Sequence, residues 1–280
     1  EPTGTTPAVH GPIASNPIVR PAVQAIRTSG TIAEVGTVFV SLPPGTVPGG
    51  GLAIITNTRT QAAVPAAMAA GGFDPVPIEG AAGDTLLVDV EVVGGGHQVL
   101  RIVVRATRRP IVVRTDPPHG KRDVSLNSVL RVIFSEPIDP GSIGGVQLLH
   151  GGATVPTHAT LSADGLRATL LADQPLAPTT DYVLSIGTGV KDLGGDPVER
   201  PVQATFTTGT SVEVAWIVTD QAALFTNPFN HELRTFDMSA VRYDDGRVTG
   251  YFNIFYPNAG WSVAGRVTCF TIVDGTAAWA

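Results

Sequence analysis

The chain has 280 residues, of which only 15% are charged, and it is rich in glycine (32) and proline (23). Because both residues destabilise helix interiors, this composition excludes a mostly helical protein, while a hydrophobic content of 43% excludes wholesale disorder. A net charge of −6 argues against a nucleic-acid-binding protein, since such binding depends on clustered Lys and Arg. The single cysteine excludes an internal disulfide, and no apolar stretch is long enough to span a membrane.

Residues 1–20 contain a proline at every fifth position from Pro2 to Pro17. Proline breaks helices and is excluded from central strands, so we expect an extended, Pro-rich tail or linker. An edge strand tolerates proline, because the missing N–H can face solvent. The candidates for such an edge contact in this tail are Pro12, Ile13, Pro17, Ile18 and Val19.

Residues 21–107 contain short stretches in which apolar and polar residues alternate. In the clearest of them, residues 86–92, Asp89 and Glu91 lie between valines. Three glycines at 94–96 then turn the chain into a second apolar run, 99–104. Period-two runs bounded by turns predict a half-buried antiparallel sheet.

Three motifs in the same segment resemble Ig-like modules of secreted bacterial proteins. They are Ile55-Thr56-Asn57-Thr58, Gly72-Phe73 and Gly83-Asp84-Thr85-Leu86. The resemblance covers most of residues 21–107 and implies an Ig-like β-sandwich there.

Residues 108–209 contain a longer series of motifs. In chain order they are Pro117-Pro118-His119-Gly120, the run 132–140 (VIFSEPIDP), the run 176–182 (LAPTTDY), the run 190–195 (VKDLGG) and Phe206-Thr207-Thr208. The series resembles the bacterial Ig-like domain of surface-layer and other extracellular proteins, which implies a sandwich and an extracellular or cell-surface location. Independently, Asp164-Gly165 is typical of a hairpin turn, and Tyr182, Leu184 and Ile186 share one face of a predicted strand.

Residues 210–280 hold all three tryptophans and most of the other aromatic residues, and Asp245-Gly246 predicts another hairpin. The runs 233–236, 245–250 and 265–269 resemble an uncharacterised C-terminal β module of secreted bacterial proteins. In that module the pattern continues past the position of Trp279. We therefore expect a β module that is incomplete within this polypeptide, with Trp279 as a candidate assembly residue.

The candidate chemical sites are each better explained by local structure. His231-Glu232 begins like a zinc-protease helix, but the second histidine position is Thr235. The acidic runs 192–196 and 244–246 are typical of tight turns rather than of calcium loops. Cys269 lies in a strand pattern and is expected to be inert. Paired carboxylates of the glycosidase kind need only meet in space, so the sequence leaves them open, but Glu136 and Asp139 are accounted for by the Ig-like motif. We therefore expect no catalytic residue, no metal, no cofactor and no enzyme.

The sequence thus predicts an all-β protein of tandem Ig-like β-sandwich modules with an extended Pro-rich N-terminal tail. The expected segments are 1–20, 21–107, 108–209 and 210–280. The leading functional hypothesis is an extracellular structural protein of a bacterial surface, a subunit of a filament or other homopolymer assembled through edge-strand contacts. The tail of one subunit would lie along an edge strand of its neighbour.

Two alternatives remain open. The chain is a carbohydrate- or surface-binding adhesin if Tyr243, Tyr251 and Trp261 form a platform on which a surface polysaccharide stacks. Alternatively, it is the non-catalytic portion of a secreted hydrolase. Neither a nucleic acid nor a membrane span enters any of these hypotheses.

Overall fold

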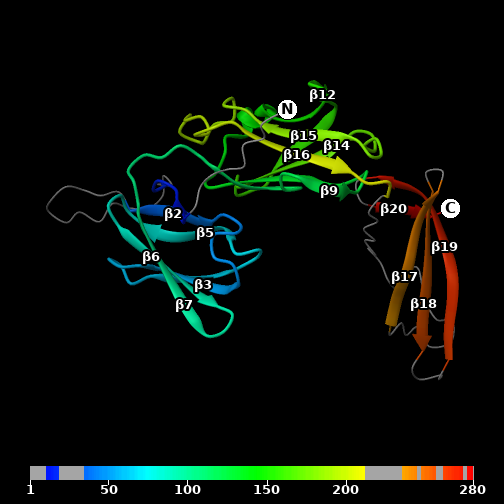
Figure 1. Ribbon diagram of the computed structural model, residues 1–280, viewed down its shortest axis with the longest axis horizontal. Coiled ribbons are helices and arrows are strands. Elements are labelled where there is room, and N and C mark those ends of the chain that lie inside the picture. The colour runs from blue at the N-terminus through cyan, green and yellow to red at the C-terminus, as the bar shows by residue number, and fades with distance from the viewer. Residues whose placement is uncertain are drawn as a thin grey trace. The chain divides into compact units, whose positions relative to one another are not determined.

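The computed structural model describes residues 11–18 and 35–211, together with the backbone of four strands between residues 235 and 279 (Figure 1). The chain divides into two compact units, residues 1–209 and residues 210–280. Within the described residues every regular element is a β-strand except one short 3-10 helix, η1 (Pro140–Gly145). The all-β fold class is therefore confirmed.

The first part of the larger unit is a sandwich of two antiparallel sheets, drawn in blue to cyan in Figure 1. One sheet has the order β1-β2-β5 and the other the order β4-β3-β6-β7. The strands are β1 (Ile13–Ala14), β2 (Gly36–Leu42), β3 (Gly50–Asn57), β4 (Ala63–Ala67), β5 (Phe73–Gly80), β6 (Thr85–Val92) and β7 (Gly96–Val103).

Alternation of apolar residues explains the core of this sandwich. Val38 and Val40 of β2 and Val88 and Val90 of β6 are completely buried between the two sheets. The polar residues between them, such as Asp89, are more exposed. The predicted half-buried strands are therefore confirmed.

The motif residues Asn57 and Asp84 meet at the ends of β3 and β6, two neighbouring strands of one sheet, which explains why they occur together. Asn57 Nδ2 donates a hydrogen bond of 2.8 Å to Asp84 Oδ2, and the guanidinium of Arg59 forms an ion pair with the same carboxylate. The backbone N–H of Ala81 also donates to it, at 2.9 Å. Burial opposes ionisation of Asp84, but these donors outweigh it and hold its pKa at about 2.

The second part of the larger unit is another two-sheet sandwich. Its sheets have the orders β13-β14-β10-β8 and β12-β11-β15-β16-β9, and all neighbours are antiparallel except β9 and β16. The strands are β8 (Val112–Asp116), β9 (Lys121–Val124), β10 (Leu130–Phe134), β11 (Val146–His150), β12 (Ala153–Val155), β13 (Thr157–Leu161), β14 (Arg167–Ala172), β15 (Asp181–Ile186) and β16 (Val202–Thr208).

The core of the second sandwich follows the predicted strand faces, because Tyr182, Leu184 and Ile186 are all buried in it. The hydroxyl of Tyr182 accepts a hydrogen bond of 2.9 Å from the backbone N–H of Ala177. Thr208 Oγ1 donates to the Ala177 carbonyl at 2.6 Å. The motif at 176–182 and the closing Thr208 thus form one hydrogen-bonded corner.

The smaller unit is described as one antiparallel sheet with the order β17-β18-β19-β20. Its strands are β17 (Thr235–Asp244), β18 (Arg247–Tyr256), β19 (Trp261–Val273) and β20 (Thr276–Trp279). Asp244 pairs with Arg247 across the position of the predicted turn, whose residues Asp245 and Gly246 lie outside the described residues.

Candidate assembly site

Residues 11–18 add a short strand segment to the edge of the first sandwich, consisting of the two-residue strand β1 and an isolated bridge at Ile18. The antiparallel register consists of the pairs Ile13–Ser41, Ala14–Val40 and Ile18–Thr37. Between them, the Ser15 N–H donates to the Phe39 carbonyl at 2.9 Å, and Ser15 Oγ accepts from the Phe39 N–H at 2.9 Å. Four residues of the tail, Ile13, Ala14, Ser15 and Ile18, therefore pair with or hydrogen-bond to a single strand, β2.

In the single chain this segment pairs with β2 of the same chain. The expected contact with an edge strand of a neighbouring subunit stays a prediction. Pro12 precedes the paired residues and Pro17 stands directly before Ile18, positions that an edge strand tolerates for proline. Val19 lies outside the described residues.

Consecutive residues of this strand are buried in different sandwiches. Ala14, 2% exposed, belongs to the core of the first sandwich. Ile13, 0% exposed, packs in a cluster with Ile111, Val113 and Ile133 of the second sandwich. Complete burial of an isoleucine side chain contributes roughly 1.5–3 kcal/mol. The strand therefore stabilises the junction of the two sandwiches as well as the edge of one.

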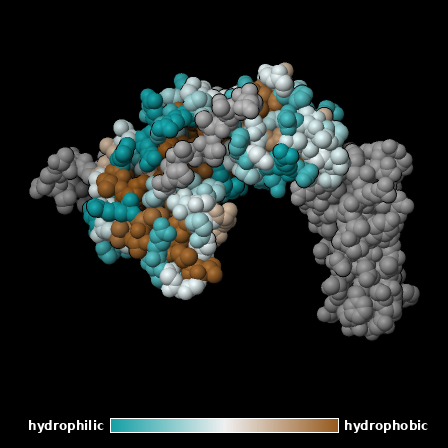
Figure 2. Space-filling view, in the orientation of Figure 1, coloured by the Kyte–Doolittle hydropathy of each residue, from teal (hydrophilic) through white to brown (hydrophobic). Residues whose placement is uncertain are grey.

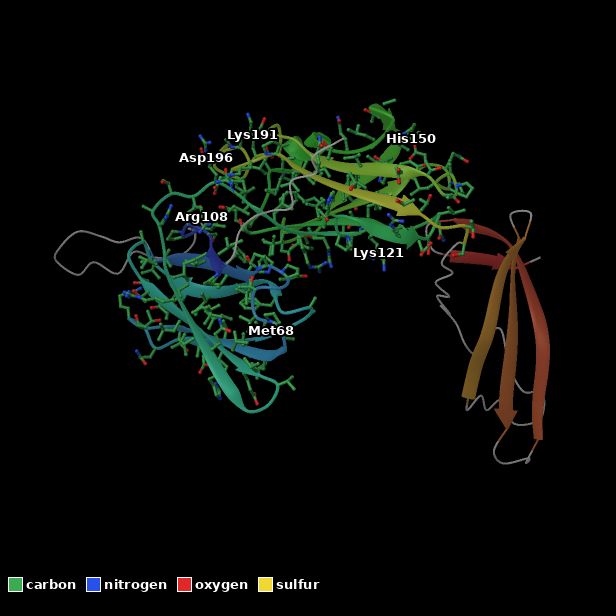
Figure 3. All side chains as sticks on the ribbon, viewed as in Figure 1. Met68, Arg108, Lys121, His150, Lys191 and Asp196 are labelled. Carbon is green, nitrogen blue, oxygen red and sulfur yellow. The ribbon has the colours of Figure 1, made fainter. Side chains whose placement is uncertain are left out.

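An arginine of the linker between β7 and β8 also holds the strand. Arg108 Nη1 donates to the carbonyl oxygen of Ala14 at 3.3 Å. Burial lowers the pKa of Arg108, and the nearby charge of Arg105 adds to that effect. Figure 3 labels Arg108 and, on a turn of the second sandwich, Asp196. Both residues line a hollow of about 490 Å³, together with Arg105, Thr107, Arg109 and Glu199.

A second contact between the sandwiches is an ion pair. Arg114 of β8 binds Asp74 of β5 through Nε and Nη2, at 2.6 and 2.7 Å. The side chains are 34% and 48% exposed, so solvent screens the pair and its contribution to stability is small.

Glu136 is a buried acid that sequence reasoning assigned to the Ig-like motif without a role. Its residue is 2% exposed, and its Oε1 has no hydrogen-bond partner within the described part of the chain. Burial, reinforced by the charge of Asp192 and opposed by that of Arg108, raises the pKa of Glu136 to about 8. The carboxyl is therefore largely protonated at neutral pH. Burial depends on contacts distant in sequence, so no local motif could have revealed this property.

The acidic run at 192–196 forms a turn, as interpreted from the sequence. Asp192 Oδ1 accepts a hydrogen bond of 2.8 Å from the Asp196 N–H, and the Asp192 N–H donates to the Asp196 carbonyl. Among the described residues, no group of three or more His, Cys, Asp or Glu side chains is arranged to hold a metal ion. His231 and Glu232 lie outside that part of the chain.

The three candidate glycan-binding residues lie on three neighbouring strands of the C-terminal sheet. Tyr243 of β17 pairs with Val248, and Trp261 of β19 pairs with Tyr256, at opposite ends of β18. Tyr251 lies on β18 between those two ends and pairs with Ala240 and Arg266. Trp279 of β20 pairs with Cys269 of β19.

The first sandwich also presents an exposed apolar face and a free edge. Figure 2 shows brown, hydrophobic areas over the first sandwich. Four exposed hydrophobic residues lie on the outer face of its β4-β3-β6-β7 sheet: Leu52, Ile54, Val99 and Val103. Among the strands that the structure describes, β7 pairs with β6 alone, and it contains no proline. Long edges of this kind are templates for pairing with another chain.

The sequence model of a family described as a bacterial Ig-like domain matches residues 106–208. The second sandwich is therefore a bacterial Ig-like domain, and the resemblance identified from its motifs is confirmed. The match supports an extracellular or cell-surface protein. No helix in the described part of the chain is long and apolar enough to cross a membrane.

Similarity to other known proteins is limited. No curated protein matches the chain significantly. Two crystal structures of the bacterial S-layer protein SbsC, its N-terminal part and residues 31–844, are each 18% identical over 57% of this chain, with a TM-score of 0.31. The chain spans 43% and 25% of their lengths. The Bacteroides ovatus protein SGBP-B, in complex with a mixed-linkage heptasaccharide, is 15% identical, with a TM-score of 0.19 over 92% of this chain and 69% of its own.

Proposed function

We propose that the chain is a non-catalytic structural subunit of a bacterial surface, which assembles into a homopolymer through contacts at the edges of its sheets. The observation that carries this proposal is the added strand at residues 11–18. In this strand the β2 edge accepts a proline-containing peptide by backbone pairing.

Two further features support self-association. The β7 edge is free among the described strands, and apolar residues such as Ile54 (45% exposed) and Val99 (57% exposed) lie on the same sheet. Exposed apolar surface and an unpaired strand edge both favour association with another chain, so their occurrence on one sheet disfavours a protein that remains monomeric. The adhesin and hydrolase alternatives remain predictions.

Electron microscopy of the purified chain tests the proposal. We expect negatively stained polymers at micromolar concentration, growing in number with protein concentration. Separate particles of the size of one 29.0 kDa chain at every concentration would contradict it.

A further inference from the structure

We propose that residues 11–18 are an exchangeable strand, and that in the polymer this segment of one copy occupies the β2 edge of the next copy. This inference rests on the proposed function. The partner that occupies the β2 edge in the polymer is a second copy of the same chain. The register would be the one seen within a single chain, with Ile13 opposite Ser41 and Ile18 opposite Thr37.

The contacts of the strand do not depend on which copy supplies it. They are backbone hydrogen bonds to β2, burial of Ile13 and Ala14, and one bond from Arg108. The only covalent tie between strand and sandwich is the connection 19–34, which reaches roughly 55 Å at full extension. Exchange therefore preserves every contact, and protein concentration decides between the closed and the exchanged form.

The acceptor is assembled from both sandwiches. The backbone of β2 supplies the pairing edge, Ile111, Val113 and Ile133 supply the pocket for Ile13, and Arg108 binds the Ala14 carbonyl. Only a copy with both sandwiches folded presents all three parts. This requirement gives specificity for a second copy of this chain over an unrelated extended peptide.

Gly36, at the start of β2, leaves room for the end of the exchanged strand. A Cβ atom on Gly36 would lie 2.7 Å from the carbonyl oxygen of Ile18, too close for any real side chain. Gly36 therefore permits the close approach by which Ile18 and Thr37 exchange two backbone hydrogen bonds, of 2.8 and 3.0 Å. A strand passed from each copy to the next in this way generates a head-to-tail chain.

Disulfide trapping between different copies tests the exchange directly. Ile18→Cys and Thr37→Cys are introduced into separate full-length chains, both carrying Cys269→Ser, and the two are refolded together and oxidised. We expect a disulfide-linked dimer that contains one chain of each kind. The double variant Ile18→Cys/Thr37→Cys, diluted before oxidation, should instead close within one chain, which shows that the register forms.

A matched control replaces the acceptor cysteine with Thr154→Cys, an exposed position on β12 of the second sandwich. Cross-linking at the same yield in this control would mean random collision and overturn the exchange. No mixed dimer despite ring closure in the double variant would also overturn it. Polymers that form without the mixed dimer would refute strand exchange but not the proposal that the chain forms a homopolymer. A mixed dimer without polymers would support strand exchange and refute the homopolymer.

A second measurement needs no cysteine. Full-length Ile13→Asp chains keep their acceptor but carry a damaged donor strand, so mixed into wild-type protein they should cap growing polymers. We expect mean polymer length to fall severalfold at equimolar mixing. Unchanged length would overturn the proposal.

Discussion

At the scale of single residues, Ile13 connects the two sandwiches more directly than any other side chain of the N-terminal strand. Truncation to Ala removes its contacts with Ile111, Val113 and Ile133 and leaves a cavity at the junction. Substitutions of this kind typically cost 2–5 kcal/mol. We expect Ile13→Ala to lower the free energy of unfolding by about 2 kcal/mol in a urea titration. Ile54→Ala, at a site 45% exposed, is the control and should change it by less than about 0.5 kcal/mol.

Glu136 should make stability depend on pH in a direction opposite to most carboxylates. Its pKa of about 8 in the folded chain exceeds the ordinary value of 4.5, so the folded state retains a proton that the unfolded state has lost. Stability therefore falls as pH rises from about 5 to 8, by up to about 1.4 kcal/mol per pH unit. Glu136→Gln should remove this fall.

The measurement is a set of urea titrations at pH 5, 6, 7 and 8, compared between wild type and Glu136→Gln. The variant should equal wild type near pH 5 and exceed it in stability at pH 8. The exposed Glu91→Gln is the matched control and should follow wild type throughout. Parallel pH profiles for wild type and Glu136→Gln would show that the carboxyl ionises freely.

Asp84 should have the opposite effect, at acid pH. Its pKa of about 2 lies below the ordinary 3.8, so its contribution is present at neutral pH and is lost as pH falls from about 4 to 2. Asp84→Asn leaves Arg59 without its ion-pair partner and should cost about 1–3 kcal/mol at pH 7. The same variant should lose less stability than wild type between pH 4 and pH 2. Urea titrations at pH 7, 4 and 2, followed by circular dichroism, test both expectations; equal stability of the two proteins at pH 7, or equal losses toward pH 2, would contradict them.

At the scale of elements, sequence alternation predicts strands well because each strand has one buried face. Val38, Val40 and Leu42 are all completely buried on one face of β2. The partner of the N-terminal strand could not be predicted, since its two-residue pairing has no period of its own. The prolines indicated an edge, but an edge strand pairs equally well with its own chain or with another.

The same limit applies to the junction. The burial of Ile13 against Ile111 and the missing partner of Glu136 Oε1 both depend on how two sandwiches meet. The spacing of residues within either segment does not predict how the two sandwiches contact each other. Contacts between motifs of one domain are more predictable from sequence, since Asn57 and Asp84 contact each other inside a single sandwich.

Gly36 provides the prediction at this scale. Gly36→Ala forces the strand at residues 11–18 away from β2, since the new Cβ would collide with the Ile18 carbonyl. We expect faster proteolysis after the N-terminal segment and fewer polymers. Gly51→Ala on β3 is the control, because nothing lies within 4 Å of the added atom. Equal proteolysis rates in the two variants would show that the strand does not need this approach.

At the scale of the whole molecule, the described residues concentrate their unusual features at one strand and its acceptor. The strand pairs with β2, enters the second sandwich through Ile13 and binds Arg108 of the linker. A segment that completes one domain and contacts another is suited to joining copies, because its contacts are the same within a chain and between chains. The bacterial Ig-like domain that it contacts supports a surface location for such a polymer.

Assembly through the N-terminal strand is tested most directly by sedimentation velocity over a concentration series, with wild type and Ile13→Asp compared under the same conditions. Wild type should shift from a species of 29.0 kDa to progressively larger ones as concentration rises, while Ile13→Asp stays near 29.0 kDa. A wild-type chain that remains a single 29.0 kDa species throughout, or an Ile13→Asp chain that grows equally, would contradict assembly through the N-terminal strand.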